Sequence, residues 1–396
     1  MSLTDFRPEF DNSYQELFQK TIVSKEIMNT RFEARLRFGE SVERVKYSID
    51  AVKVRDVTRG AASTIDVISD SPELLQINIE REAAFHISDG EVTQAGPLNP
   101  GEVIGGKIGH KVALDLDARC FAEIVNAANT FDNGDLTTLS PTGTPITLTS
   151  TTVPQMATRM PAKLRRKENQ TTNGMVLVAD SYAMADIEQY LLAKDINLAD
   201  ATFVNGYAGP IRGATAYVSE ALTGEVIVDT ATQPANNDAI TVGDLTFTFV
   251  TTLGSTEGNV LRGSNADDAR DNFIAAVTRG AGAGTTYVAF TGDDLDTQED
   301  MLLSTVTYAG GNVGVRSAGS GRLDVSSSQG DLVVHNFIHA YYGKRGAIDL
   351  VVQDMSPVDM RPTDDRRGTN VFSSYLAGIK TFSDGAVQFL DVWIKS

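Results

Sequence analysis

Residues 45–87 alternate apolar and polar side chains with the period of two that is typical of β-strands. The apolar members of this pattern are Val45, Tyr47, Ile49, Val52, Val54, Val57, Ile65, Val67, Leu75, Ile77 and Ile79. Turns are expected at 59–61 and 70–72, which makes the segment a long hairpin. Two or three strands alone are marginally stable in water, because they have no second layer against which to bury an apolar face. The segment therefore needs a partner that covers it.

Residues 110–131 lack Gly and Pro and predict the longest helix of the chain. Their apolar residues recur at helical spacing, at Val112, Leu116, Cys120, Phe121, Ile124, Val125 and Ala128. With a rise of about 1.5 Å per residue, such a helix spans about 30 Å, the breadth of a small domain. The segment 96–101, which is rich in Gly and Pro, predicts a loop before it.

The rest of the chain alternates predicted helices and strands, which indicates an α+β or α/β fold, and we expect the α+β class. The predicted elements are an amphipathic run at 14–22, a strand at 174–179, a helix opened by Asp180 and Ser181, a helix at 331–342, a strand at 347–352, and a C-terminal hairpin of 375–382 with 387–394 turned at 383–385.

Residues 224–330 differ in composition from the rest of the chain. They contain 15 of the 34 glycines, no lysine, and 14 acidic residues against 5 arginines, so they carry −9 of the total net charge of −18. This break indicates an inserted module. Its expected elements are strands at 239–242, 245–251, 287–290, 303–308 and 314–317 and a helix at 266–278, which form a small α+β domain.

The overall charge, with 34 Lys and Arg against 52 Asp and Glu, argues against general attraction to nucleic acid or to an anionic membrane. Cys120 is the only cysteine, which excludes an intrachain disulfide and any zinc site with two thiolates. No apolar stretch approaches the roughly 18 residues of a membrane-spanning helix, and the N-terminus has no secretory pattern. A soluble globular protein is expected.

Two short patterns point to nucleotide or metal chemistry, and both are incomplete. Gly101–Lys107 fits the G-x4-G-K part of a phosphate-binding loop, but Ile108 stands where Ser or Thr would hold magnesium, so a flexible glycine hinge is favoured. His335 and His339 have the spacing of two zinc ligands on a helix, but Asn336 replaces the general-base Glu of a metalloprotease. We expect no catalytic, cofactor-binding or metal-binding residues.

Two charged runs have simpler interpretations. Lys163–Lys167 is the strongest local positive cluster, and a solvated loop is favoured over contact with a polyanion or an acidic neighbour. The acidic run at 293–300 lacks the Gly and the final Glu of a calcium-binding loop and is expected to be exposed surface.

Three segments carry a resemblance to a known family. Asn205–Leu222 resembles the strand-turn-strand of tailed-bacteriophage major capsid proteins that ends in the phrase Y-x-S-E-x-L. Lys344–Leu350 and Tyr375–Val392 are similar to the C-terminal hairpin of the same family. The resemblance covers about 1–222 and 331–396. It implies the Hong Kong 97 type capsid fold, with an inserted α+β domain added in this chain.

The resemblance implies an order of parts that agrees with the predicted elements. The implied parts are an N-terminal arm at 1–44, an extended β-hairpin loop at 45–88, a peripheral domain with its spine helix at 89–134, a first axial segment at 135–222, the insertion at 223–330, a second axial segment at 331–352, and the C-terminal strands of the peripheral domain at 353–396.

The function implied by the resemblance is structural and not enzymatic. A major capsid protein assembles into pentamers and hexamers that form the icosahedral shell around viral double-stranded DNA, within a virion assembled in the host cytoplasm. The implied partners are further copies, scaffold, portal and decoration proteins, and packaged DNA through weak contacts, without a membrane. Some members link a loop lysine to a neighbour's asparagine. Here Lys46 and Lys53 lie near the base of the loop and no lysine occupies 54–106, so no such link is expected.

Three alternatives remain open from the sequence. The first is the shell of an encapsulin-like protein nanocompartment. The second is a metal-dependent hydrolase that uses His335 and His339. The third is a tail-tube or adhesin subunit, because inserted modules also decorate such proteins.

Overall fold

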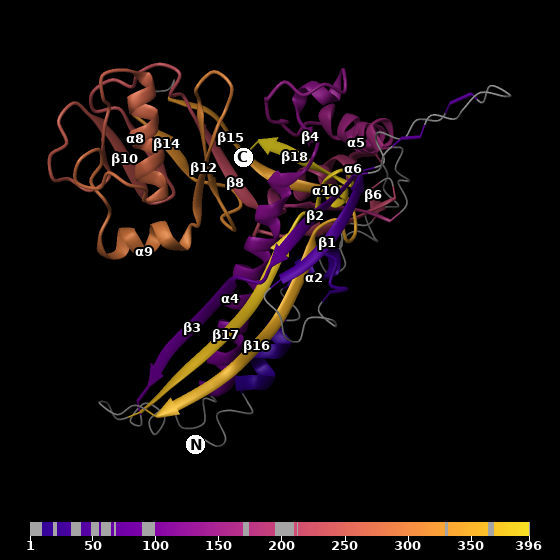
Figure 1. Cartoon of the computed structure of the whole chain (residues 1–396), viewed down its shortest axis with the longest axis horizontal. Helices are drawn as coiled ribbons and strands as arrows, with labels where there is room; N and C mark the ends of the chain where they lie inside the picture. The colour runs from indigo at the N-terminus through magenta and orange to yellow at the C-terminus, as the bar shows by residue number, and fades with distance from the viewer. Residues whose placement is uncertain are drawn as a thin grey trace. The chain divides into compact units, whose positions relative to one another are not determined.

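The structure is a computed structural model (Figure 1). It describes residues 10–18, 22–32, 41–48, 55–56, 65–66, 69–88, 100–168, 174–194, 210–211, 213–328, 332–362 and 368–395. The chain forms two compact units: the first comprises 1–18, 28–109 and 346–385, and the second comprises 19–27, 110–345 and 386–396. Both units combine helices with sheets, so the predicted α+β class is confirmed.

Two antiparallel sheets belong to the first unit. The hairpin of β1 (Ser41–Ser48) and β2 (Ser69–Gln76) pairs in register from Ser41 opposite Gln76 to Ser48 opposite Ser69. The second sheet has the order β16-β17-β3, with β16 at Asp349–Pro362, β17 at Thr369–Lys380 and β3 at Ile79–Ile87. Figure 1 shows these three strands running side by side along their length.

The predicted hairpin is confirmed in part. The turn expected at 70–72 is wrong, because those residues lie inside β2, where Pro72 stands opposite Val45. A two-stranded sheet has a free edge on each strand, so the missing N–H of a proline costs it little there. The turn expected at 59–61 lies outside the described residues. Strand β3 leaves the hairpin and pairs with β17 instead.

Helix α4 (Pro100–Ala122) is the longest described helix, and the 3-10 turn η2 (Glu123–Asn126) follows it. The prediction of a helix at 110–131 was right about its existence and wrong about both ends. The segment expected to be a glycine-containing hinge, 101–107, is the first part of the helix. The physical reason is close packing against residues 10–18, which form a helix in the same unit.

The second unit contains a nine-stranded sheet. Its main path is β12-β13-β8-β15-β5-β7-β6, while β18 pairs with β15 and with β4. The strands are β4 (Thr130–Phe131), β5 (Met175–Ala179), β6 (Pro210–Ile211), β7 (Ala214–Val218), β8 (Thr223–Val228), β12 (Leu303–Thr307), β13 (Val313–Ser317), β15 (Val333–Lys344) and β18 (Phe389–Lys395). The helical elements around it are α2 (Ser24–Ile27), η3 (Asn133–Leu136), α5 (Thr152–Glu168) and α6 (Ser181–Lys194). Helix α6 begins as predicted, because the Asp180 carboxylate accepts the N–H of Ala183 at 3.1 Å.

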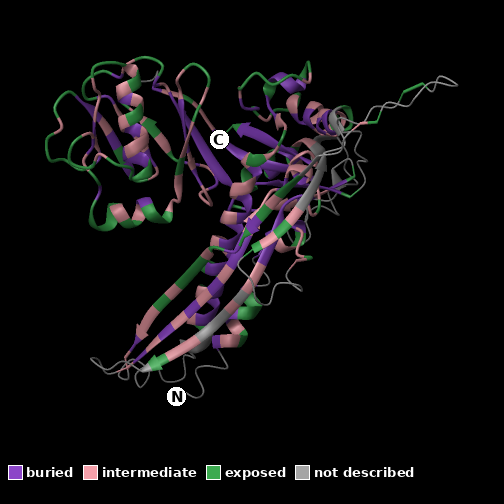
Figure 2. Cartoon of the chain, in the orientation of Figure 1, coloured by how far each residue is buried: buried purple, intermediate pink, exposed green. Residues whose placement is uncertain are grey.

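A four-stranded sheet lies within the compositionally distinct segment. Its order is β11-β10-β9-β14, from β9 (Ala239–Val242), β10 (Leu245–Val250), β11 (Asn259–Leu261) and β14 (Val325–Ser327). Helix α8 (Ala266–Thr278) packs Phe273 against Phe247 and Phe249 of this sheet. Figure 2 shows the buried interior of these strands and the mostly exposed helix α9 (Gly292–Asp300). The predicted strand at 287–290 is wrong, since only isolated bridges form at Tyr287.

The helix predicted at 331–342 is wrong, because this segment is strand β15. β15 is bonded to β8, β18 and β5, and it is buried continuously from Phe337 to Gly343. A strand buried on both faces has no period-two alternation, so its apolar run is easily mistaken for a helix.

The predicted C-terminal hairpin is also wrong. The strands are there, but β17 pairs with β16 and β3, whereas β18 pairs with β15 and β4. The expected turn at 383–385 lies in α10 (Ser383–Ala386). The partners β3 and β4 lie hundreds of residues before the strands with which they pair, so they leave no local signal.

Candidate functional site: the β1–β2 hairpin and buried ion pairs

The β1–β2 hairpin is covered by its own unit on one face only. Val42 and Leu75 stand opposite each other, and Leu75 is fully buried in a cluster with Phe382. Glu43 and Leu74 form the neighbouring pair, and both are exposed. Successive residues of a strand point to opposite faces, so the second pair belongs to the uncovered face.

Farther along the same segment, Ile65 is 87% exposed, and Leu74 at the hairpin base is 40% exposed. The neighbouring Arg55 and Asp66 form a two-pronged ion pair, with N–O distances of 2.8 and 2.7 Å. Full burial of one large aliphatic side chain stabilises by about 1.5–3 kcal/mol. Within the described residues, this apolar surface has no cover, and a second molecule that covered it would gain that stabilisation.

Arg44 ties strand β1 to the end of the unit's C-terminal segment. Its guanidinium is bonded to Asp384, lies 3.7 Å from the carboxylate of Asp349 and sits 5.2 Å from the centre of the Phe382 ring. Asn29 donates its side-chain amide to Asp349. One cation therefore joins two carboxylates and an aromatic face at the hairpin base.

Strand β2 is tied to the same segment. The N–H of Ser383 donates to the Glu73 carboxylate at 3.1 Å, and the Lys380 ammonium donates to the carbonyl oxygen of Leu74 at 2.6 Å. Both strands of the hairpin are thus held at 380–384.

The carboxyl of Asp349 is buried at this base, with 2% of its surface exposed. Burial raises the pKa of this carboxyl, and the negative charge of Asp384 raises it further. The hydrogen bond from Asn29 and the positive charge of Arg44 lower it, and the resulting pKa is about 6. The base therefore contains a group that changes charge near neutral pH.

Glycines on α4 let helix 10–18 approach closely. A Cβ added at Gly105 would lie 2.6 Å from the carbonyl oxygen of Phe10, and one added at Gly109 would lie 2.5 Å from that of Tyr14. Phe10, Tyr14 and Phe18 stack along their helix at ring distances of 6.2 and 6.0 Å. The G-x4-G-K pattern is therefore a helix-packing pattern, and the expectation of a flexible hinge is wrong.

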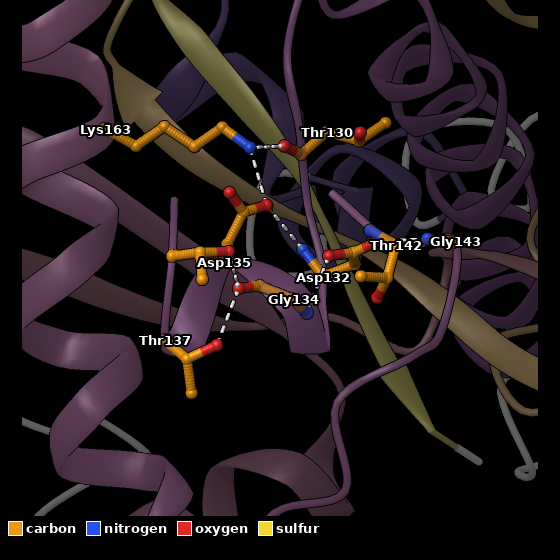
Figure 3. A network of polar contacts seen from close by, with 9 residues as sticks. Thr130, Asp132, Gly134, Asp135, Thr137, Thr142, Gly143 and Lys163 are labelled. Atoms are coloured by element: carbon orange, nitrogen blue, oxygen red, sulfur yellow. Dashed lines mark hydrogen bonds and ion pairs between the residues drawn. The ribbon is translucent and has the colours of Figure 1, made fainter. Parts of the chain in front are cut away.

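The basic run Lys163–Lys167 lies on helix α5, not on the expected loop. Lys163 is buried and donates its ammonium to the carboxylate of Asp135 at 2.5 Å and to the carbonyl oxygen of Thr130 (Figure 3). A buried ammonium group is stable only when it is paired with an opposite charge and hydrogen-bonded. Arg165 and Arg166 are exposed, so only part of the run is solvated as predicted.

The segment under α5 is fixed by a second aspartate. Asp132 accepts the N–H groups of Gly134 at 2.9 Å and of Thr142 at 2.6 Å, as well as that of Gly143, while its own N–H donates to Asp135 at 3.1 Å. Figure 3 shows these groups converging beside Lys163. The network holds residues 132–143 as a rigid loop.

His335 and His339 lie on strand β15, so their expected position on a helix is wrong. The ring of His339 contacts a carboxylate through each nitrogen: Nε2 lies 2.8 Å from Glu225 and Nδ1 lies 2.9 Å from Asp391. Burial disfavours the charged ring, but Asp391 and Glu225 raise its pKa to about 9. A protonated imidazole has no lone pair for a metal. Among the described residues, no group of three His, Cys, Asp or Glu is arranged to hold a metal.

Further polar groups complete the network around His339. Arg316 donates to Glu225 at 2.7 Å, the Tyr308 hydroxyl donates to the same carboxylate at 2.5 Å, and the Trp393 indole donates to Asp391 at 2.9 Å. His339 and Arg316 together hold the pKa of Glu225 below its usual range, although burial alone would raise it. Two cations balance two carboxylates, which makes this a structural charge cluster.

The remaining candidates carry no site. The acidic run at 293–300 forms helix α9, and its carboxylates are exposed as predicted. Cys120 is fully buried, and burial raises the pKa of its thiol, which leaves it protonated and unreactive. Lys46 lies in β1, whereas Lys53 falls outside the described residues. Of the helices that the structure describes, none has the length and apolar character needed to cross a membrane.

Comparison with known proteins finds similarity in structure only. No family model matches the chain, and no curated protein matches it. A structure from Mycobacterium phage Che8 is similar with a TM-score of 0.48 and 14% identity over 93% of this chain and 90% of that chain. The capsid structure of the cyanophage P-SCSP1u is similar with a TM-score of 0.46 and 13% identity, over 91% and 84%. A virus-like particle from Pyrococcus furiosus is similar with a TM-score of 0.40 and 11% identity, over 96% of both chains.

The sequence reasoning missed the buried acids. Asp391 stands inside the apolar strand Phe389–Lys395, and Glu225 stands inside Thr223–Val228. A carboxylate in such a strand is a signal that a cation lies opposite, because an unpaired buried charge is very costly. Which cation that is could not be read from the local sequence.

Proposed function

We propose that this chain is the major capsid protein of a tailed bacteriophage, with a Hong Kong 97 type fold, and that it has a structural role without catalysis. Copies assemble into pentamers and hexamers that form an icosahedral shell around double-stranded DNA. The observation that carries this proposal is the β1–β2 hairpin, which is anchored at its base and exposes Leu74 and Ile65. A hairpin that is anchored at its base and leaves apolar side chains uncovered is suited to contact a neighbouring copy.

The order of the described parts supports the same proposal. An N-terminal helix at 10–18 is followed by the hairpin, by the long helix α4, and by a sheet-containing body that also takes in the C-terminal strand. This is the order that the resemblance implies. We assign the N-terminal arm to 1–44, the extended loop to 45–88 and the insertion to 223–330.

The insertion should face away from packaged DNA. It carries a net charge of −9, and helix α9 places several exposed carboxylates on its surface. Phosphates of packaged DNA would be repelled by such a surface. We assign it a stabilising or decorating role on the outside of the shell, and an image of the particle that placed it on the inner wall would contradict this assignment.

Deletion of residues 60–70 tests the shell role directly. We expect soluble, folded subunits that fail to form closed particles, because the neighbour-contacting part of the hairpin is gone. Negative-stain electron microscopy of the purified product, with circular dichroism as the folding control, measures both outcomes. Normal closed shells made from the deleted chain would refute the role of the hairpin.

A matched pair of point variants refines this test. Leu74→Ser and Val334→Ser each remove an aliphatic side chain that is about 40% exposed. Only the first lies on the hairpin, so only the first should lower the yield of particles. Equal losses from both variants would indicate a general effect of surface polarity.

The contents of the particles test the viral role. Particles from infected or lysogenic cells should contain DNA and portal protein, and the recombinant chain should form shells rather than tubes. Particles that enclose an enzyme and no DNA would identify a nanocompartment instead.

A further inference from the structure

Helix α5 carries three cations on one face. Arg159, Lys163 and Arg166 follow the spacing i, i+4 and i+7, so they lie along one line of the helix surface. Arg159 donates to the carbonyl oxygen of Thr137 at 2.8 Å, and Lys163 donates to Asp135 and to Thr130. Arg166 is exposed, and no hydrogen bond or ion pair to another described residue engages it.

Lys163 and Arg166 line a cavity of about 650 Å³ formed with residues 128–130 and 138–141. The lining includes the hydroxyl groups of Thr138 and Ser140 and the amide of Asn129. No acidic side chain is among the described residues that line it, although the whole chain carries a net charge of −18. Because Lys163 is paired with Asp135, the net positive charge among the described lining residues comes from Arg166.

The wall of the cavity is held in a costly conformation. Leu139 has a φ of 54°, in the left-handed region that a branched side chain rarely adopts. The N–H groups of Gly134 and Thr142, which lie on either side of Leu139 in the sequence, both donate to the carboxylate of Asp132. The surroundings thus keep the cavity formed without a ligand, which lowers the cost of binding one.

We propose that this cavity binds a phosphate group. The Arg166 guanidinium supplies a fork of N–H donors, Lys163 has a third N–H after its two bonds are made, and the Ser140 hydroxyl and the Asn129 amide complete a donor set suited to a tetrahedral oxyanion. The Thr138 hydroxyl already donates to the carbonyl oxygen of Gly134. The cavity has space for a phosphate together with part of an ester substituent. The phosphate comes either from a nucleic acid backbone or from a free phosphate compound, and the inference goes beyond the proposed shell function.

Titration of the full-length chain with inorganic phosphate tests the proposal, by calorimetry at an ionic strength kept constant with chloride. We expect saturable binding, which Arg166→Gln weakens by about tenfold or more, as befits the loss of a charge-assisted contact. Arg165→Gln is the matched control, since Arg165 is the adjacent exposed arginine and does not line the cavity. Binding that is absent in the wild type, or that both variants weaken equally, would overturn the proposal.

A second measurement needs no variant. A dicarbonyl reagent modifies exposed arginines, and peptide mass spectrometry reports the rate at each one. Phosphate should slow modification of Arg166 and leave Arg165 unchanged. Equal rates at Arg166 with and without phosphate would count against the site.

A short single-stranded oligonucleotide distinguishes the two sources of the phosphate. If it binds, is displaced by inorganic phosphate and loses affinity in Arg166→Gln, the site takes a backbone phosphate. If inorganic phosphate binds and the oligonucleotide does not, the site takes a free phosphate compound. Both results support the cavity as a phosphate site, and their failure would leave the shell proposal unaffected.

Discussion

Replacement of Asp349 by Asn should stabilise the hairpin base at neutral pH and have little effect in acid. The folded pKa of this carboxyl is about 6, against 3.8 for the unfolded chain. A raised pKa means that the ionised form is disfavoured by folding. The penalty is complete above pH 6, decreases as the pH falls through 6, and is gone below about pH 4.

The difference of about two pKa units corresponds to about 3 kcal/mol in the free energy of unfolding. Asp349→Asn preserves an oxygen that can accept the amide of Asn29, and Arg44 keeps its bond to Asp384. The variant should therefore be more stable than the wild type by up to about 3 kcal/mol at pH 7.5 and about equal at pH 4. Exchange of backbone amides in 41–48, followed as a function of urea, reports this local free energy.

Carbon-13 NMR of Asp-labelled protein gives the pKa directly, and the signal missing from Asp349→Asn identifies the residue. A second variant, Asp384→Asn, removes a like charge that raises the pKa of Asp349, so the midpoint should move to lower pH. A midpoint near 4 in the wild type, or a stability difference that does not vary with pH, would refute the reasoning.

Two further predictions concern packing and the charge cluster. Gly109→Ala should destabilise the packing of helix 10–18 by about 1–3 kcal/mol despite the better helix propensity of Ala, because the new Cβ meets backbone atoms of Tyr14. Gly106→Ala is the control and should cost little, because the nearest neighbour of its new Cβ is the movable end of the Leu17 side chain. Equal urea midpoints for the two variants would contradict this prediction. His339→Leu should cost about 3–5 kcal/mol because it leaves two buried carboxylates without their shared cation, whereas His335→Leu on the same strand should cost less than about 1 kcal/mol. In the wild type the stabilisation from His339 is complete below pH 6.5 and is lost as the pH rises through about 9, so the difference between wild type and His339→Leu should shrink in alkali.

Local rules predicted the elements whose causes are local. Three elements could be expected from short windows of sequence. They are helix α6 with its cap at Asp180, helix α8 with its apolar face, and strands β9 and β10 on either side of the turn at 243–244. The alternation in 45–87 predicted a hairpin here, although it placed a turn within β2.

The errors came where distant residues decide the structure. Glycines that usually end a helix are tolerated in α4 because another helix lies against them. The central strand β15 has the apolar run of a buried helix, and only its neighbours make it a strand. Lys163 became buried because Asp135, 28 residues away, lies beneath it. No short window of sequence contains those partners.

The position of β8 and β13 has a practical meaning for engineering. Strand β8 is bonded to β15 on one side and to β13 on the other, and its Glu225 belongs to the cluster around His339. Excising the whole acidic segment would strip an inner strand from the main sheet and leave His339 facing one carboxylate. A foreign domain meant for display should instead be spliced between 229 and 312. This replacement removes the edge strand β12 and Tyr308, but β8 and β13 survive, and their paired ends, Val228 opposite Val313, supply two closely spaced attachment points.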